Sequence, residues 1–177
     1  AFLKICYQST LTIPNKKEMY DLATIMYTSG TTDNPKGIIF NQTNIITKRF
    51  ARALALPEIG SNDSFLCYLP LYHTFGRWLE MMGTIFWGST YTFTENTSFK
   101  TLLRDFKIVQ PTVFISIPKR WIQIREQVAA TIPIEKSEEK AIKEVTQSIT
   151  GENLKWGLSA AGFLDPDIFK FFHQNDI

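Results

Sequence analysis

The sequence predicts an α/β fold in which a mostly parallel sheet is flanked by helices. Short apolar runs, rich in β-branched and aromatic residues, alternate along the chain with segments in which apolar residues recur at helical spacing. This alternation is typical of strand–helix–strand units, whose crossover helices cover both faces of a parallel sheet. With 177 residues, of which 44% are hydrophobic, the chain is large enough for one domain with a full core.

The first predicted strand is Leu22–Met26, a near-continuous apolar run of the kind found where both faces of a strand are buried. It leads into residues 27–37, which read Tyr-Thr-Ser-Gly-Thr-Thr-Asp-Asn-Pro-Lys-Gly. This loop offers hydroxyl groups, two glycines and one lysine, with Asp33 as its single acidic residue. Hydroxyls, main-chain N–H groups and an ammonium group are the donors that phosphate oxygens accept from. The loop therefore predicts a polyphosphate site.

The spacing of this loop differs from that of the Walker phosphate-binding loop. The Walker pattern requires glycine directly before the lysine, and Ser or Thr directly after it to hold magnesium. Here Pro35 precedes Lys36 and Gly37 follows it, so we exclude a P-loop nucleotidase. The residues predicted to bind the phosphates are Thr28, Ser29, Gly30, Thr31, Thr32, Asp33, Asn34, Pro35 and Lys36.

Two further elements follow the loop. Ile38–Phe40 is a second short apolar run, and residues 41–44 include Asn and Thr, which favour the start of a helix. Apolar residues then recur at helical spacing as far as Leu54, and Pro57 ends the helix.

A third strand is predicted for Phe65–Leu71, where Pro70 confines the sheet hydrogen bonds to the residues before it. His73 comes just past the end of this strand, at the edge where open parallel sheets bind ligands. A histidine in that position is either a site residue or a packed structural residue, and the residues alone leave both interpretations open.

The middle of the chain continues the alternation. Met81–Trp87 is predicted to be a buried helix whose Met, Phe and Trp side chains belong to the core, and Tyr91 and Phe93 mark a strand. Residues 102–109 form an amphipathic helix, and Thr112–Ile117 is a strand rich in β-branched residues.

The last third of the chain begins with a helix start at residues 118–121. Residues 135–150 are dense in Glu and Lys with a narrow apolar stripe, which predicts a surface helix. A strand over residues 154–159 is followed by a helix with Asp165 as its cap and Pro166 in its first turn.

Composition excludes several classes of function. The formal charge of +2 comes from 19 basic and 17 acidic residues spread along the chain, so we predict no nucleic-acid partner. Cys6 and Cys67 lie among apolar residues, which predicts buried side chains in a reducing compartment. No apolar stretch is long enough to span a membrane, and residues 2–7 are too short for a signal peptide. We expect a soluble, cytoplasmic protein.

Residues 27–37 closely resemble the signature Y-T-S-G-T-T-G-x-P-K-G of the adenylate-forming (AMP-binding) superfamily, which includes the acyl-CoA synthetases. Ten of the eleven positions match when the free position is counted, and Asp33 stands where the family usually has glycine. The next family segment, G-V-x-x-T-H-x-N, is matched in part, with Gly37 and Asn44 kept and Gln42 where histidine is common.

Three later segments extend the resemblance. The family pattern L-P-L-x-H-x-x-x-R fits residues 69–77, and it implies that His73 shapes or gates the acyl site, with Arg77 on the following helix. Residues 111–121 match P-T-x-F-x-x-V-P-R-x-W of the long-chain enzymes in part, because Arg120 is displaced by one position. In place of S-G-G-A-P-L the chain has Ser159 followed by Ala160, Ala161 and Gly162, which by resemblance pass under the adenine and along the acyl pocket.

The resemblance implies that residues 1–177 are part of the large N-terminal domain of a longer acyl-CoA synthetase, without its small C-terminal domain. The parent would be an ATP-dependent long-chain fatty acid–CoA ligase that uses ATP, Mg²⁺ and coenzyme A, with Lys36 and His73 as its catalytic residues here. No metal ligand is assigned within the chain, contact with a membrane surface is allowed, and the chain alone is expected to be inactive.

Two alternatives stay open. Asp33, Ala160 and Ala161 depart from the family pattern and are also compatible with a non-catalytic module that binds a nucleotide or acyl group. An adenylation domain for another carboxylic acid is the second alternative.

Overall fold

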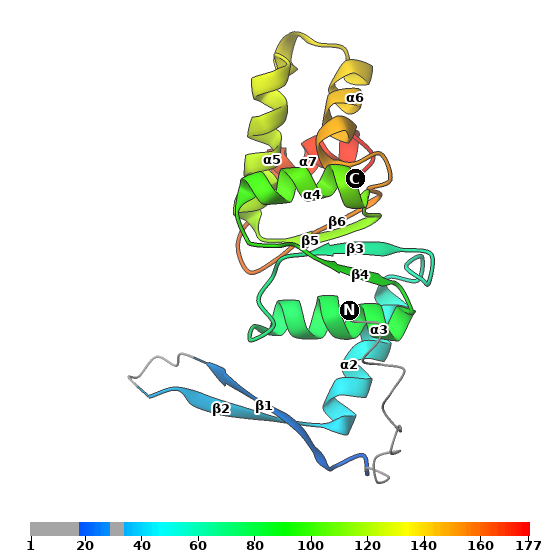
Figure 1. Cartoon of the computed structure of the whole chain (residues 1–177), viewed down its shortest axis with the longest axis vertical. Helices are drawn as coiled ribbons and strands as arrows, with labels where there is room; N and C mark the ends of the chain where they lie inside the picture. Colours follow the sequence, from blue (N-terminus) through cyan, green and yellow to red (C-terminus); the bar gives the residue numbers. More distant parts are fainter. Residues whose placement is uncertain (1–17, 29–33) are drawn as a thin grey trace. The chain divides into compact units, whose positions relative to one another are not determined.

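The computed structural model describes residues 18–28 and 34–177 (Figure 1). The chain divides into two units, residues 1–48 and residues 49–177, and each is described by itself. None of the helices in the described ranges is long and apolar enough to cross a membrane.

The first unit is built on an antiparallel ribbon of two strands, β1 (Leu22–Thr28) and β2 (Lys36–Asn41). Helix α2 (Gln42–Ala55) follows β2 directly. Its start is fixed by a reciprocal pair of hydrogen bonds: the Asn41 side chain accepts from the Asn44 N–H at 2.8 Å, and the Asn44 side chain accepts from the Asn41 N–H at 3.1 Å. The predicted helix start at residues 41–44 is confirmed.

The prediction that both faces of Leu22–Met26 are buried is wrong. In β1 only Met26 is buried, whereas Leu22 is 57% exposed and Ile25 is 44% exposed. The run forms a strand as predicted, but its partner is the antiparallel β2 rather than a strand of the parallel sheet. An apolar run specifies an extended backbone, whereas the number of layers that cover it depends on residues far away in the sequence.

The second unit contains a four-stranded sheet in the order β4-β3-β5-β6 (Figure 1). Its strands are β3 (Ser64–Cys67), β4 (Thr90–Phe93), β5 (Val113–Ser116) and β6 (Trp156–Ser159). Every pair of neighbouring strands is parallel. The predicted α/β fold class is therefore confirmed.

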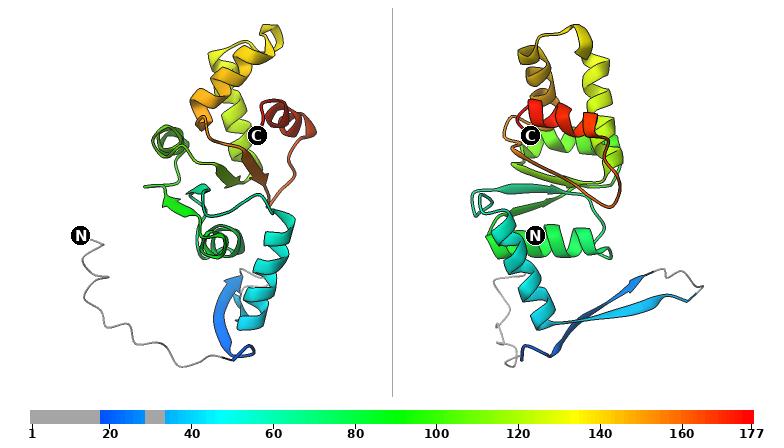
Figure 2. Two further views of the ribbon diagram at one scale, coloured as in Figure 1. Left: turned by 90° about the vertical axis from the view of Figure 1, so that its right-hand side faces the viewer. Right: turned by 180° about the vertical axis from the view of Figure 1, so that it is seen from behind.

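Helices cover both faces of this sheet. On one face lie α4 (Phe99–Val109), α5 (Pro118–Thr131), α6 (Glu139–Thr150) and α7 (Pro166–Gln174), with the short 3₁₀ helix η2 (Ile134–Lys136) between α5 and α6. On the other face lies the π-helix η1 (Phe75–Met81), which continues into α3 (Met82–Trp87). Figure 2 shows α6 (orange) and α7 (red) across the sheet from α3 (green).

The core follows from the alternation of side chains along β5, whose four residues are all buried. Phe114 faces α4 and α5, where its ring contacts those of Phe106 and Trp121. Val113 and Ile115 face the opposite way and pack in a second cluster with Leu79 of η1. A strand buried on both faces thus contributes to a hydrophobic cluster on each side of the sheet.

The helix predicted over Met81–Trp87 is present, but it is less buried than expected. Gly83 and Thr84 are buried, whereas Ile85 is 68% exposed and Phe86 is 41% exposed. The edge of Phe86 contacts the ring of Phe50, with the ring centroids 5.4 Å apart. Within the described residues, Phe86 therefore belongs to an exposed aromatic pair and not to the core.

The amino ends of three strands are tied together by Asp63. Its carboxylate accepts hydrogen bonds from the Gly60 N–H at 2.9 Å and the Thr112 hydroxyl at 2.7 Å, and it forms an ion pair with Lys155 at 2.9 Å. Burial by itself would raise the pKa of Asp63, but these three interactions outweigh it and hold the pKa below its usual value. Asp63, Thr112 and Lys155 lie just before β3, β5 and β6, so this network aligns the strands.

Candidate functional site

The predicted phosphate loop is described only at its two ends. Five predicted residues, Ser29, Gly30, Thr31, Thr32 and Asp33, lie outside the described residues. Thr28 is the last residue of β1, and Asn34 and Pro35 precede β2. All three are exposed, as is Lys36.

The sequence suggested that Lys36 lies on the loop. In the structure it is the first residue of β2. It is the register partner of Thr28. The ribbon therefore brings the Thr28 hydroxyl and the Lys36 ammonium group to the same end, on either side of the loop that connects the strands. An exposed ammonium group and a hydroxyl at the same end of the ribbon are donors that an anion accepts from.

In the second unit the candidate site is the carboxyl edge of the parallel sheet. Because the strands are parallel, the carboxyl ends of β3, β5 and β6 meet at one edge, and the segments that follow them run along it. Open parallel sheets bind ligands at this edge.

A shared hydrogen-bond network holds three of these segments together. The hydroxyl oxygens of Tyr68 and Ser116 share a hydrogen bond of 2.7 Å, and the Ile117 N–H donates to the Tyr68 hydroxyl at 3.4 Å. The Ala160 N–H donates to the Ser116 carbonyl at 3.1 Å. Sequence reasoning did not select Tyr68 or Ser116. Their only signal was a position at, or just past, the end of a strand.

Arg120 packs against the same network but serves the structure. Its guanidinium group lies 5.7 Å from the ring centroid of Tyr68 and 5.9 Å from that of Phe99. It also donates hydrogen bonds to the Gln123 side chain and the Thr97 carbonyl. These contacts fix the start of α5 on the sheet edge.

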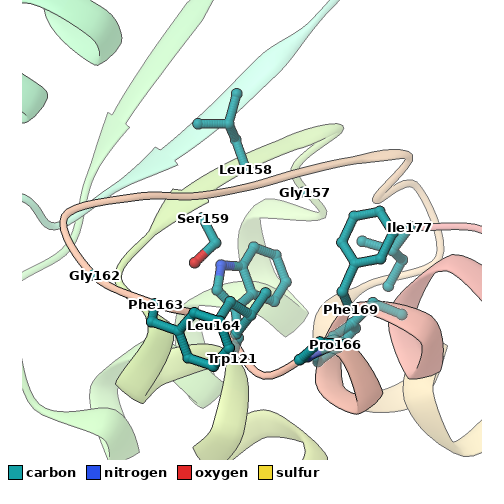
Figure 3. A pocket seen from close by; sticks show the side chains of 11 residues that line it. Trp121, Gly157, Leu158, Ser159, Gly162, Phe163, Leu164, Pro166, Phe169 and Ile177 are labelled. Atoms are coloured by element: carbon teal, nitrogen blue, oxygen red, sulfur yellow. The ribbon is translucent and has the colours of Figure 1, made fainter.

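A cavity of about 650 Å³ lies beside β6 and the bend that follows it (Figure 3). Most of its lining is apolar, from Trp121 and the residues of the bend and α7: Phe163, Leu164, Pro166, Phe169 and Phe172. Two polar groups line it as well, the Ser159 hydroxyl and the Trp121 indole N–H, and both are buried without a hydrogen-bond partner. An apolar group that carries an acceptor oxygen is the chemistry that such walls accommodate.

The predicted bend of Ala160, Ala161 and Gly162 lies next to this cavity. Gly162 is part of its lining. Ala161 has φ = +63°, in the left-handed region that favours glycine, whereas Ala160 has no positive φ. The chain thus keeps a glycine-like backbone at position 161 with an alanine, at a cost in strain.

We expect Ala161→Gly to raise the free energy of unfolding by roughly 0.5–1 kcal/mol, because relief of left-handed strain exceeds the added entropy of the unfolded chain. The matched control is Ala160→Gly, which adds entropy without relieving strain and is expected to lower stability by a similar amount. Urea unfolding monitored by circular dichroism measures both. Equal changes in the two variants would contradict a strained Ala161.

His73 lies after β3, in the turn that leads into η1, and its side chain is exposed. Its ring Nδ1 accepts a hydrogen bond from the Phe75 N–H at 3.3 Å, and the backbone N–H of His73 donates to the Pro70 carbonyl at 3.0 Å. Arg77 donates from Nε to the Leu71 carbonyl at 2.8 Å. The turn is so compact that a Cβ at Gly76 would lie only 2.6 Å from the Pro70 carbonyl oxygen, so only glycine fits there.

The role of His73 in a reaction stays a prediction. The same is true of Lys36, of the phosphate-loop residues and of the 160–162 bend. Within the described residues, no group of three or more His, Cys, Asp and Glu side chains is placed to hold a metal ion.

Comparison with known proteins gives three kinds of likeness. A family model described as "AMP-binding enzyme" matches residues 5–176. The chain is 31% identical over 156 residues to the peroxisomal long chain acyl-CoA synthetase 7 of Arabidopsis thaliana, covering 88% of this chain and 22% of that protein. The chain therefore spans about a fifth of the length of this curated relative.

Solved structures share the fold at lower identity. A malonyl-CoA ligase in a ternary product complex with methylmalonyl-CoA and AMP aligns with a TM-score of 0.69 at 21% identity, over 90% of this chain and 31% of the other. The adenylation domain of a carboxylate reductase from Mycobacterium chelonae aligns with a TM-score of 0.68 at 18% identity, over 91% of this chain and 26% of the other.

Proposed function

Because this chain belongs to the AMP-binding enzyme family, we propose that it is part of the large N-terminal domain of an ATP-dependent long-chain fatty acid–CoA ligase. The observation that carries the proposal is residues 27–37, whose sequence matches the family signature and whose described ends bring Thr28 and Lys36 together on one ribbon. The likeness to a long chain acyl-CoA synthetase over 88% of the chain favours a fatty acid as the substrate.

The proposed reaction has two steps. The carboxylate of the fatty acid attacks the α-phosphate of ATP, which forms an acyl-adenylate and releases pyrophosphate. The thiol of coenzyme A then attacks the acyl carbon and displaces AMP. In the first step an anion approaches an anion, so the enzyme must neutralise charge and align the reactants more than it must supply a base.

The proposed roles of the residues follow from that requirement. Lys36 and the loop hydroxyls hold the β- and γ-phosphates that become the leaving group. His73 shapes the place where the carboxylate meets the nucleotide, and the 160–162 bend lies along the adenine and the acyl group. Mg²⁺ would share in neutralising the phosphates, and we assign no protein ligand to it.

Pyrophosphate release tests the proposed function. The complete protein is expected to release pyrophosphate when ATP is supplied with a fatty acid, and to form acyl-CoA when coenzyme A is added. The assay compares acids of increasing chain length with malonate and aromatic acids. No release with any acid would refute the proposal, and release only with malonate or aromatic acids would assign the chain to another ligase of the family. The 177-residue chain alone is expected to be inactive, because it spans 22% of the Arabidopsis relative.

A non-catalytic module that binds a nucleotide or acyl group is the second candidate. Two observations favour it: the carboxylate of Asp33 within the phosphate loop, and the strained Ala161 where the family has glycine. Nucleotide binding without pyrophosphate release in the complete protein would distinguish this candidate from the ligase.

We also propose a cytoplasmic location, which is supported by the reducing environment that the two cysteines predict. Fractionation of cells would test it.

A further inference from the structure

The side chain of Glu80 is fully buried within the second unit. It lies on the π-helix η1, which packs against the face of the sheet formed by β3 and β5. The exposed fraction of Glu80 is 0%, and neither of its carboxyl oxygens makes a hydrogen bond of normal geometry. Glutamate is almost never buried in this way without a partner, so the position demands an explanation.

The groups that face Glu80 come from two strands. The Cys67 thiol, at the end of β3, interacts with both the Glu80 carboxyl and the Tyr91 hydroxyl of β4. Cys67 is 1% exposed, and the Tyr91 hydroxyl oxygen is buried. Helix α3 contributes no titratable side chain. On η1 itself Arg77 donates to the Leu71 carbonyl, and no cation is among the groups that shift the pKa of Glu80.

An ionised carboxylate in such a place would be very unfavourable, because among the described residues neither a cation nor a set of N–H groups compensates for the lost water. Burial raises the pKa of Glu80 from 4.5 to about 9, although the Cys67 thiol acts in the opposite direction. Burial also raises the pKa of the Cys67 thiol and that of the Tyr91 hydroxyl. Glu80 is therefore the first of the three groups to ionise as the pH rises.

We propose that Glu80 is a neutral, protonated acid at physiological pH, and that its ionisation under alkaline conditions loosens the packing of η1 against the sheet. This is a pH-sensitive device within the fold, and the inference does not rest on the proposed ligase activity. The cluster of Glu80, Cys67 and Tyr91 joins η1, β3 and β4.

The position of η1 gives this device a consequence at the sheet edge. Gly76 of η1 packs directly on the carbonyl groups of Leu69 and Pro70, and the His73 N–H donates to Pro70 in the same turn. A shift of η1 therefore moves the turn that holds His73. Ionisation of Glu80 thus couples the pH to the geometry of the candidate site.

The sign of the pH dependence follows from linkage. The pKa of Glu80 is higher in the folded than in the unfolded chain, so its proton stabilises the folded state. This stabilisation is fully present below pH 4.5 and is lost as the pH rises towards about 9. Across that window the folding equilibrium constant falls by up to about tenfold for each pH unit.

The test is urea unfolding of the full chain between about pH 5 and pH 9, for the wild type and Glu80→Gln. The glutamine has nearly the same shape and never ionises, so we expect its folding equilibrium to lack the pH-dependent loss and to exceed that of the wild type at alkaline pH. Glu58→Gln is the matched control, because Glu58 is exposed on the same unit and its loss should leave the wild-type slope unchanged. Equal slopes in wild type and Glu80→Gln, or the same loss of slope in Glu58→Gln, would overturn the proposal.

A second measurement on the wild type keeps the proposal testable if Glu80→Gln does not fold. Infrared spectroscopy of the folded protein at neutral pH should show the carbonyl band of a protonated carboxylic acid, and this band should disappear as the pH rises towards about 10. The fluorescence of the buried Trp78, on the same helix, should change over the same range. Absence of the protonated band at neutral pH would refute a neutral Glu80.

Discussion

Phe114→Ala is expected to lower the free energy of unfolding by about 4 kcal/mol, which is the usual effect of truncating a fully buried aromatic residue. The exposed fraction of Phe114 is 0%. Its ring centroid lies 4.8 Å from that of Phe106, 5.3 Å from that of Trp121 and 5.9 Å from that of Tyr68. The alanine would leave a cavity among three aromatic rings that are held by separate elements and are therefore unable to collapse into it.

Urea unfolding monitored by near-ultraviolet circular dichroism measures this loss. Phe163→Ala is the matched control, since Phe163 is 82% exposed and its truncation should change stability by less than about 0.5 kcal/mol. Loss of the Phe114 ring also removes a contact of Tyr68. We therefore expect the hydrogen bond between the Tyr68 and Ser116 hydroxyl groups at the sheet edge to be disturbed. If the two variants lost similar amounts of stability, Phe114 would not be at the centre of the core.

Lys36→Ala in the complete protein is expected to reduce the rate of pyrophosphate release by roughly 100- to 1,000-fold, the effect of removing one preorganised charge-stabilising donor. This expectation depends on the proposed ligase activity. The stability of the protein should change by less than about 0.5 kcal/mol, because Lys36 is exposed at the first position of β2. A large loss of activity in a stably folded variant is the signature of a residue that acts on the substrate.

Lys48→Ala provides the control for Lys36. Lys48 is an exposed lysine of the same unit, on α2, and its removal changes the net charge by the same amount. Its rate of pyrophosphate release should stay close to that of the wild type. Equal rates in the wild type and Lys36→Ala would reject the role of Lys36 while leaving the family membership intact. Equal losses in both variants would indicate a general effect of charge.

Elements with a strong local signal could be predicted closely. Asn41, just before α2, and Asn44, in its first turn, form the expected cap, and the Asp165 side chain accepts from the Asp167 N–H at 2.8 Å at the start of α7. The strand predicted over Thr112–Ile117 is β5, at Val113–Ser116. In each case the signal lies within a few residues of the element, where backbone conformation and capping are decided.

Features that depend on distant neighbours could not be predicted in the same way. The sequence did not indicate that β1 would pair with β2 and leave Leu22 and Ile25 exposed. It also gave no reason to select Ser116 over other serines, since the importance of Ser116 comes from its position on β5, in register with Ser159 of β6. Which strands become neighbours is a property of the whole chain.

The sequence by itself determined the α/β class, the order of the elements and the family of this protein. Hydrophobic periodicity, helix caps and a family signature motif each depend on a short stretch of residues. Only the tertiary structure decided that Glu80 is buried with no cation among the groups that shift its pKa, that Ala161 is held in the left-handed region, and that a cavity lies beside β6. Burial, strain and cavities arise where segments far apart in the chain come together, so no local pattern encodes them.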